Sequence, residues 1–371
     1  MPRIKPDIEI YAKIKVIGVG GSGGNTISRM AKSKIQGVDL VALNTDAQDL
    51  HHCFSPVKIQ IGKNVTRGLG AGMNPSLGEQ AAEESQNEIA DYLKGADMVF
   101  VTCGLGGGTG TGAIPVVAEI ARELGALTIG VVTKPFSFEG AQRLRIADAG
   151  LAKLRDRVDS LIIIQNDKIL SIVDKKITLL RSFSIIDDIL KQGVQGISDL
   201  ITTPGLINVD FADIKTIMGN SGQALMGVGR SSSANRAEEA AREALNSPLL
   251  DISVDGAKGL LFNIAGGEDL SMVEVDKAAK IITQSMDPDA RVIFGVTQDD
   301  RLRKREIKIT VIATGFNKDI QPSLFKKEEN FKNFGQMPDV EKSEKNKKNN
   351  LEENLEEEKE WDVPAFIRKK K

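Results

Sequence analysis

The chain has 371 residues, of which 41% are hydrophobic and 27% charged, and its formal net charge is −2. This is the composition of a soluble globular protein with room for two domains, and so small a net charge gives no general argument for binding nucleic acid or a membrane. With only two histidines, adjacent at positions 51 and 52, histidine-based catalysis is disfavoured, so carboxylates, a metal ion or water are expected to carry the chemistry.

The first residues, 1–12, form a charged extension without the apolar core of a signal peptide. No apolar run approaches the ~20 residues that a membrane helix requires. We therefore expect a cytosolic protein.

From residue 13 to about 175, apolar β-rich runs alternate with amphipathic helical stretches. The runs cover residues 13–19, 38–44, 57–61, 98–102, 127–132 and 161–164. Continuous apolar runs are typical of strands buried on both faces of a parallel sheet with helices on each side. This region is predicted to be an α/β domain with a mostly parallel sheet.

A long helical pattern follows at residues 176–205, where Pro204 and Gly205 end it. We interpret it as a connecting helix leading to a second, smaller α/β domain at residues 206–316. In that domain helices are predicted at 211–218, 234–246 and 270–285, and strands at 224–228, 258–264, 291–296 and 306–314.

Beyond residue 316 the composition changes to Lys, Glu and Asn with few large apolar residues. Residues 317–360 are predicted to be a disordered linker, because they cannot bury enough apolar surface to fold. The chain's only tryptophan, Trp361, opens a final segment, 361–371, that combines apolar residues with a basic end and is predicted to be a partner-binding peptide.

Residues 106–112 read Gly-Gly-Gly-Thr-Gly-Thr-Gly and join the predicted strand at 98–102 to a helix expected near Ala113. Such a loop presents backbone N–H groups to an anion, and the helix that follows directs its positive dipole end toward it. A phosphate chain is the predicted ligand.

Two more glycine clusters, at residues 20–25 and 68–72, are expected to meet the first at the carboxyl edge of the sheet. The first of these precedes a helix expected near Thr26. It also fits a nicotinamide-binding fingerprint, with Asp39 or Asp46 as the ribose carboxylate, or a plain tight turn. No Gly-Lys-Ser/Thr follows any cluster, so the phosphate charge would be met by helix dipoles, N–H groups and Mg²⁺.

Together with residues 44–48 (Asn-Thr-Asp-Ala-Gln), 135–140 (Pro-Phe-Ser-Phe-Glu-Gly), 208–213 (Asn-Val-Asp-Phe-Ala-Asp) and the tail from Trp361, these loops closely resemble the FtsZ family of bacterial tubulin homologues. The resemblance covers residues 10–316 and the tail. Small departures from the family pattern occur at Ser22, Met73, Cys103 and Leu105, and none removes a donor or a carboxylate.

The resemblance implies a Rossmann-like GTPase domain that binds GTP or GDP with Mg²⁺ held mainly by the phosphates. The implied phosphate contacts are Gly21, Ser22, Gly23, Gly24, Asn25, Gly72, Met73, Gly104, Gly107, Gly108, Thr109 and Gly110. Thr133, Glu139 and Arg143 would surround the ribose, Asn166 and Asp187 would contact the guanine edge, and Phe183 would pack on the ring.

A carboxylate suits guanine because it accepts from the N1–H and the exocyclic amine, a donor pair that adenine lacks. Without the resemblance, Asp187 would read as a solvated helix aspartate, Arg143 as a surface arginine and Phe183 as a core residue.

Asn208, Asp210 and Asp213 follow the long helix, whereas Asp187 lies near its start. Because the helix advances roughly 24 Å between residues 187 and 203, both ends cannot touch one nucleotide. The resemblance makes the three residues catalytic toward the GTP of a neighbouring subunit in a head-to-tail filament. The alternative is that the aspartates cap the helix expected at Phe211.

The resemblance also implies a cytoplasmic protein that forms the cytokinetic ring at the inner face of the membrane. Residues Trp361 to Arg368 would recruit the membrane-tethering protein FtsA and other division partners, and the basic end would add attraction for lipid or serve solubility. A plasmid-partition filament GTPase and an NAD-binding oxidoreductase are the alternative functions.

Overall fold

The computed structural model describes residues 12–33, 35, 37–172, 178–203, 205–247, 256–284, 286–299 and 302–316. Contacts divide the chain into one compact unit of residues 1–322 and another of residues 323–371, so all described residues belong to the first. Residues 1–11 of the predicted extension, the predicted linker at 317–360 and the peptide at 361–371 lie outside the described residues. No helix in the described ranges has the length and apolar character to cross a membrane.

The described strands form one eleven-stranded sheet in the order β3-β2-β1-β4-β5-β6-β8-β11-β9-β10-β7. Its first part is parallel, as predicted, and consists of β1 (Ile14–Val19), β2 (Val38–Asn44), β3 (Val57–Gln60), β4 (Met98–Gly104), β5 (Leu127–Lys134) and β6 (Ser160–Gln165). Each begins within one residue of its predicted start, because a continuous apolar run marks a strand buried on both faces.

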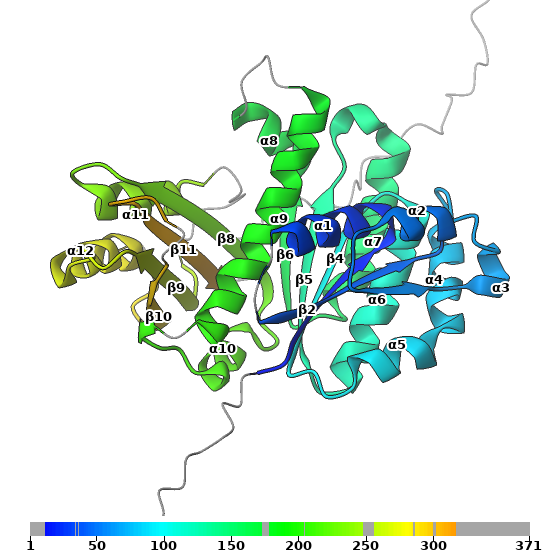
Figure 1. Cartoon of the computed structure of the whole chain (residues 1–371), viewed down its shortest axis with the longest axis horizontal. Coiled ribbons are helices and arrows are strands. Elements are labelled where there is room, and N and C mark those ends of the chain that lie inside the picture. The colour runs from blue at the N-terminus through cyan, green and yellow to red at the C-terminus, as the bar shows by residue number, and fades with distance from the viewer. Residues whose placement is uncertain are drawn as a thin grey trace, which may run out of the picture. The chain divides into compact units, whose positions relative to one another are not determined.

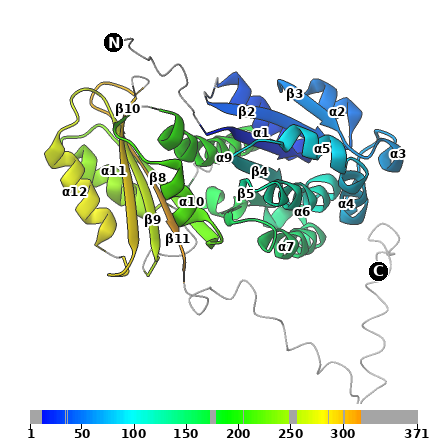
Figure 2. The same cartoon turned by 90° about the horizontal axis from the view of Figure 1, so that it is seen from below.

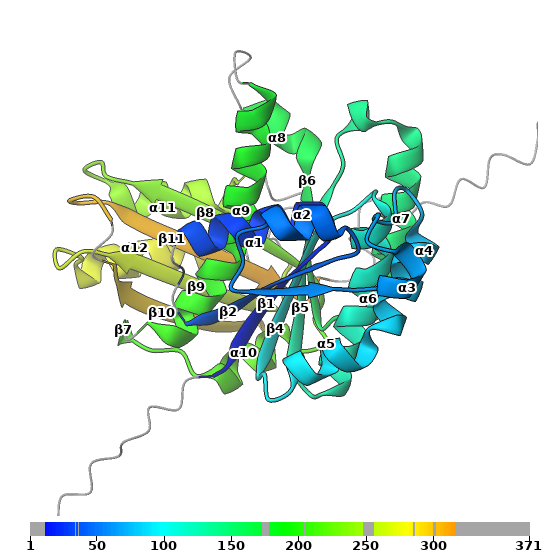
Figure 3. The same ribbon diagram turned by 45° about the vertical axis from the view of Figure 1, so that its right-hand side comes forward.

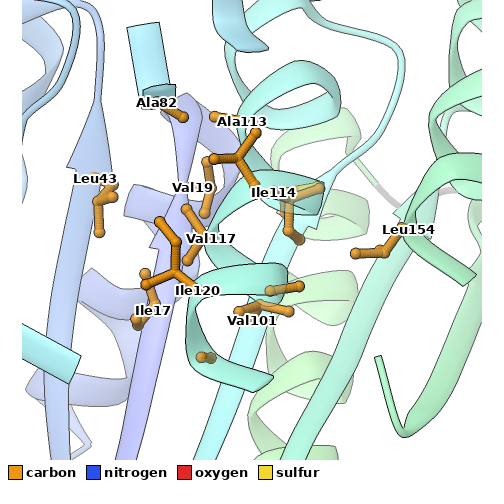
Figure 4. Packing of buried hydrophobic residues seen from close by; sticks show 14 of the residues in the cluster. Ile17, Val19, Leu43, Ala82, Val101, Ala113, Ile114, Val117, Ile120 and Leu154 are labelled. Atoms are coloured by element: carbon orange, nitrogen blue, oxygen red, sulfur yellow. The ribbon is translucent and has the colours of Figure 1, made fainter. Parts of the chain in front are cut away.

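Helices cover both faces of this parallel part (Figure 1, Figure 2). One face packs on α4 (Pro75–Glu84), α5 (Gln86–Leu93), α6 (Gly108–Glu123) and α7 (Ala141–Arg155), and the other on α1 (Gly20–Lys32), α9 (Leu179–Thr202) and α10 (Phe211–Met218). Figure 4 shows the first of these cores, where Ile17 and Val101 of the sheet face Ile114 and Val117 of α6. Short helices α2 (Ala47–His52), α3 (Lys63–Thr66), α8 (Asn166–Ile172) and the 3₁₀ turn η1 (Ser137–Glu139) complete the connections.

The second part of the sheet is mixed. Strand β8 (Gly222–Ser231) pairs parallel with β6 and antiparallel with β11 (Ile307–Thr314), which pairs antiparallel with β9 (Gly259–Gly266). Strand β10 (Arg291–Gln298) runs parallel to β9 and antiparallel to β7 (Gly205–Ile207). Helices α11 (Arg236–Leu245) and α12 (Met272–Thr283) cover one face of these strands over a core of their own.

Two predicted helix starts are wrong, because α1 begins at Gly20 rather than Thr26 and α6 at Gly108 rather than Ala113. Glycine is a poor helix former, so the sequence pattern places these residues in loops. Close packing overrides that preference: a Cβ on Gly112 would lie 1.9 Å from the Pro75 carbonyl oxygen, and one on Gly23 would lie 2.6 Å from the Gly18 carbonyl carbon. The glycines therefore let the first turns of both helices pack against neighbouring backbone.

Candidate nucleotide site

A pocket of about 350 Å³ lies where the carboxyl ends of β1, β4, β5 and β6 meet the first turns of α1 and α6. Ligands of parallel α/β sheets bind at this edge. Of the residues singled out from the sequence, the pocket is lined by Gly21, Ser22, Gly72, Gly104, Gly107, Gly108, Thr109, Gly110, Thr133, Glu139, Arg143, Asn166, Phe183 and Asp187. The structure thus brings residues from all three glycine clusters into one cavity.

At one end of the pocket, where the phosphates are predicted to bind, the wall is formed by the backbone of glycines at the starts of α1 and α6. Gly20 has a φ of +73°, and a Cβ there would lie 2.9 Å from the Gly110 nitrogen. Gly108 packs equally closely, since its Cβ would lie 2.6 Å from the Ala71 oxygen. The N-cap residues of the two helices, Val19 and Gly107, provide no side-chain cap. The Gly108 N–H donates to the Gly72 carbonyl oxygen at 2.6 Å, so the other first-turn N–H groups at the two positive helix ends are the ones suited to an anion.

Two threonines form hydrogen bonds that stabilise the glycine-rich loop at residues 106–112. The Gly106 N–H donates to Thr111 Oγ1 at 2.9 Å, and the hydroxyls of Thr109 and Thr45 lie 2.5 Å apart. Only Gly106, with a φ of +102°, uses the left-handed conformation within residues 106–112. Hydrogen bonds of Thr109 and Thr111 therefore restrain the conformation of this glycine-rich loop.

At the other end of the pocket lie polar groups suited to a sugar and a base. Glu139 accepts from Arg143 Nη1 at 2.7 Å and from the Phe136 N–H at 2.9 Å, which fixes both charged side chains beside Thr133. Asn166 is 5% exposed, and its Oδ1 has no hydrogen-bond partner among the described residues. An unpaired buried amide oxygen on a pocket wall is a site where a ligand donor would be favoured.

Asp187 is 8% exposed and is held from α1 by Arg29, whose Nε donates to Oδ2 at 2.7 Å, and by the Thr26 hydroxyl at 3.1 Å from Oδ1. Burial raises the pKa of Asp187, and the Arg29 charge and the two hydrogen bonds oppose that rise. The rings of Phe183 and Phe136 form a T-shaped contact with centroids 5.7 Å apart, and Phe183 remains 41% exposed, so part of its surface is accessible for stacking.

Four predicted phosphate residues do not line the pocket. Gly23 is buried against Gly18, and Gly24 lies next to Cys53, to whose sulfur its Cβ would come within 3.5 Å. Asn25 and Met73 are exposed. Gly23 and Gly24 therefore support the helix packing that shapes the site.

Sequence reasoning missed several participants. Leu105, Pro135 and Ile186 also line the pocket, and Arg29 and Thr26 act behind Asp187. Thr26 and Arg29 stand three residues apart, which puts them on one face of α1, but no sequence signal shows that this face meets α9. Cys103 is fully buried beneath the loop, and burial raises the pKa of its thiol, so it is an inert core residue.

The residues predicted to be catalytic lie at the opposite end of α9. Figures 1 and 3 place α8 and the start of α9 at the top and α10 at the bottom. Asn208, Asp210 and Asp213 are exposed there; Asn208 Oδ1 accepts from the Gly205 N–H at 2.7 Å, and Asp210 caps α10 through the Ala212 N–H at 3.1 Å. The capping alternative is thus realised for Asp210 through one of its two carboxylate oxygens.

Comparison with known proteins identifies the family. Residues 13–174 match the model of the Tubulin/FtsZ family GTPase domain, and residues 222–317 match that of the FtsZ family C-terminal domain. An FtsZ dimer from M. jannaschii has 48% sequence identity and a TM-score of 0.79, and the match covers 83% of this chain and 89% of that one. A point mutant of M. jannaschii FtsZ matches at the same identity and TM-score, with 82% and 92% covered.

A more distant likeness concerns the fold alone. CetZ2 from Haloferax volcanii, solved as a protofilament with GTPγS bound, has 22% identity and a TM-score of 0.70 over 82% of this chain and 94% of that one. The two family models and the 48% identity over most of both chains agree with the α/β fold and its glycine-lined pocket. This chain therefore belongs to the Tubulin/FtsZ family of GTPases, and within it to the FtsZ family.

Proposed function

We propose that the chain binds GTP in the glycine-lined pocket, assembles head-to-tail into protofilaments and hydrolyses GTP at the contact between neighbouring subunits. The separation of pocket and carboxylates is the observation that carries this proposal. Asp187 at the pocket and Thr202 at the end of α9 are fifteen residues apart, or roughly 22 Å of helix. Because α9 separates the two ends and β7, which follows it, pairs with β10, Asp210 lies away from the pocket of its own chain.

The phosphates would be bound by the first-turn N–H groups of α1 and α6 and by the two helix dipoles. No three His, Cys, Asp or Glu side chains gather as a metal site in the described part of the chain. Mg²⁺ would take its oxygen ligands mainly from phosphates and water, and its chemistry there would be to neutralise phosphate charge.

Guanine would be selected at the other end of the pocket. Asp187 accepts from the N1–H and the exocyclic amine, Asn166 Oδ1 offers an acceptor in need of a donor, and Phe183 offers a ring face. Adenine would leave the buried Asp187 carboxylate facing an acceptor nitrogen, which is unfavourable.

Hydrolysis would be completed by the exposed loop before α10 and the first turn of that helix. Asp210 and Asp213 would orient and polarise the attacking water on the neighbour's nucleotide, and Asn208 would contact that nucleotide or its ion. A contact between unlike ends whose rotation does not close builds a filament, which makes hydrolysis depend on assembly. The FtsZ dimer and the CetZ2 protofilament are assemblies of this fold.

In a cell, such filaments would form the cytokinetic ring in the cytoplasm at the inner face of the membrane. The segment from Trp361 to Arg368 would dock on membrane-tethering and division proteins such as FtsA. The four basic residues 368–371 would add attraction for anionic lipid or acidic partners.

Light scattering and phosphate release after addition of GTP, GDP, ATP or NAD test the proposal. We expect scattering and hydrolysis with GTP alone, and a rate per subunit that rises with protein concentration because each site needs two subunits. A rate per subunit that is independent of concentration would contradict the shared site.

A further inference from the structure

The carboxylate of Asp187 is held from behind by α1. Arg29 Nε donates to Oδ2 at 2.7 Å, and Arg29 Nη1 donates to the Ser184 hydroxyl at 2.6 Å. One guanidinium thus grips two residues that stand three apart on α9, a spacing that puts them on one face of the helix. The Arg29 side chain is 37% exposed and that of Asp187 is 11% exposed, so Arg29 is partly in contact with solvent while the carboxylate that it bonds is largely buried.

The second partner of Asp187 is weaker. Thr26 Oγ1 lies 3.1 Å from Asp187 Oδ1 and also 3.1 Å from the Ser22 carbonyl oxygen. A hydroxyl has one proton, so Thr26 satisfies only one of these acceptors at a time. The charge-assisted bond from Arg29 is therefore the dominant restraint on the orientation of the carboxylate.

The Asp187 carboxylate keeps acceptor sites for a ligand. Each carboxylate oxygen accepts about two hydrogen bonds, and the protein uses one on each oxygen of Asp187. One acceptor site per oxygen therefore remains, which matches the two parallel donors on the edge of guanine.

We infer that Arg29 is a positioning residue for base recognition, which holds the Asp187 carboxylate so that its two remaining acceptor sites face the guanine donors. This inference rests on the proposed function, because it takes Asp187 as the guanine contact. Arg29 itself lies behind Asp187 and does not line the pocket.

The positioning role of Arg29 should also appear in the pH dependence of nucleotide binding. Burial raises the pKa of Asp187, the Arg29 charge lowers it, and the neighbouring charge of Asp188 on α9 raises it. Across the pocket, Glu139 and Arg143 form an ion pair of no net charge. Removing Arg29 therefore raises the pKa of Asp187, so a larger share of the carboxyl is protonated, and unable to accept on both oxygens, as the pH falls.

The test measures binding of GDP and IDP at pH 8 and pH 6, because inosine lacks the exocyclic amine and diphosphates avoid assembly. We expect Arg29→Gln to weaken GDP about tenfold, the scale of one hydrogen bond to a charged group, and IDP much less. The loss should grow at pH 6. Arg29→Lys keeps the charge and should restore most of the insensitivity to pH.

Lys32→Gln removes the same charge from the exposed last turn of α1 and is the matched control, with no change in either affinity expected. A merely structural role of Arg29 would weaken GDP and IDP equally. Equal weakening, or a wild-type GDP-to-IDP ratio in Arg29→Gln, overturns the inference.

Asp187→Asn separates this inference from the proposed function. If Asp187→Asn abolishes the preference for GDP over IDP while Arg29→Gln leaves it intact, the guanine contact stands and the role of Arg29 falls. If Asp187→Asn leaves the preference unchanged, guanine recognition lies elsewhere and both fall.

Discussion

The pocket is walled by glycine backbone and helix ends packed so closely that a Cβ would collide, whereas the loop before α10 carries exposed carboxylates on an ordinary helix cap. The first end is shaped to bind an anion and a base. The second end offers acidic side chains that accept or orient a proton but has no phosphate cradle of its own. Under the proposed function, binding and chemistry reside on opposite ends of one subunit and would come together when two subunits meet.

The largest effect is expected at the exposed end. Asp210→Asn keeps a good N-cap on α10 but removes the charge, so stability and GTP binding should be unchanged while assembly-dependent hydrolysis falls about 10²-fold or more. Phosphate release, nucleotide binding and thermal unfolding measured together check this. Wild-type turnover by Asp210→Asn would leave capping as the whole role of the residue.

At the pocket end, two adjacent glycines make a matched pair. Gly23→Ala places a Cβ 2.6 Å from the Gly18 backbone and 2.8 Å from the Thr102 oxygen, and it should cost about 2 kcal/mol of unfolding free energy as overpacking does. Gly24→Ala meets only Cys53 Sγ at 3.5 Å and should be neutral or slightly stabilising, because alanine favours the helix. Thermal or denaturant unfolding measures the free energy of unfolding of the two variants and so checks this difference. Equal stabilities would mean that close packing does not shape this end.

A substitution in a third region, between α11 and α12, should change stability but should alter neither the nucleotide pocket nor the loop before α10. Arg236, 5% exposed, bonds Glu274 and Asp269 at 2.7 Å each and joins the N-terminal ends of α11 and α12. Hydrogen bonds, first from Arg236 and then from Ser271, lower the pKa of Glu274 from 4.5 to about 2 against the opposing effect of burial. Because the folded pKa is depressed, this stabilisation is complete above about pH 4.5 and is lost as pH falls toward 2.

Arg236→Gln should therefore lower the free energy of unfolding by about 2 kcal/mol at pH 7 and by less at pH 3. GTP affinity measured at a temperature where the variant is folded should stay at the wild-type value. A destabilisation that is the same at both pH values would exclude the pair with Glu274 as its cause.

The smallest effect in solution is expected from removing residues 361–371. Filament assembly and GTP hydrolysis should be unchanged, because both ends of the subunit remain, while recruitment to a membrane through partner proteins should be lost. Sedimentation with GTP and co-localisation with membranes measure the two properties. If the shortened protein were still recruited to membranes, the proposed docking role of residues 361–371 would be wrong.

Much of the fold could be predicted because its cause is local. The strands of the parallel sheet are uninterrupted apolar runs, and the helices from Phe211 onward show regular apolar spacing. Strand β7 could not be predicted, since its three residues, Gly205–Ile207, have no period and form a strand only by pairing with β10. The first turns of α1 and α6 could not be predicted as helix, because glycine has a low helix propensity. Their glycines are helical because they allow close packing against neighbouring backbone.

The site divides in the same way. The glycine clusters indicate an anion site from the sequence alone, and the structure places residues of all three around one cavity. The hold of Arg29 on Asp187 could not be predicted, because the two residues are 158 positions apart and meet only through the packing of α1 on α9. That Asp210 caps a helix was anticipated as an alternative, and its exposed position is compatible with both roles.

A complementation experiment with two variants tests the shared site most directly. Asp187→Asn is expected to prefer XTP, because xanthine carries a carbonyl where guanine carries its amine, and it keeps an intact loop before α10. Asp210→Asn binds GTP but lacks that loop's charge. GTP labelled on its γ-phosphate is supplied together with unlabelled XTP, and release of labelled phosphate is followed.

Each variant alone should release little label. An equal mixture should release it at about a quarter of the wild-type rate, the share of contacts in which a GTP-loaded subunit meets an intact loop in a random filament. If the mixture released no more label than the two variants separately, the pocket and the carboxylates would not form one site across two subunits.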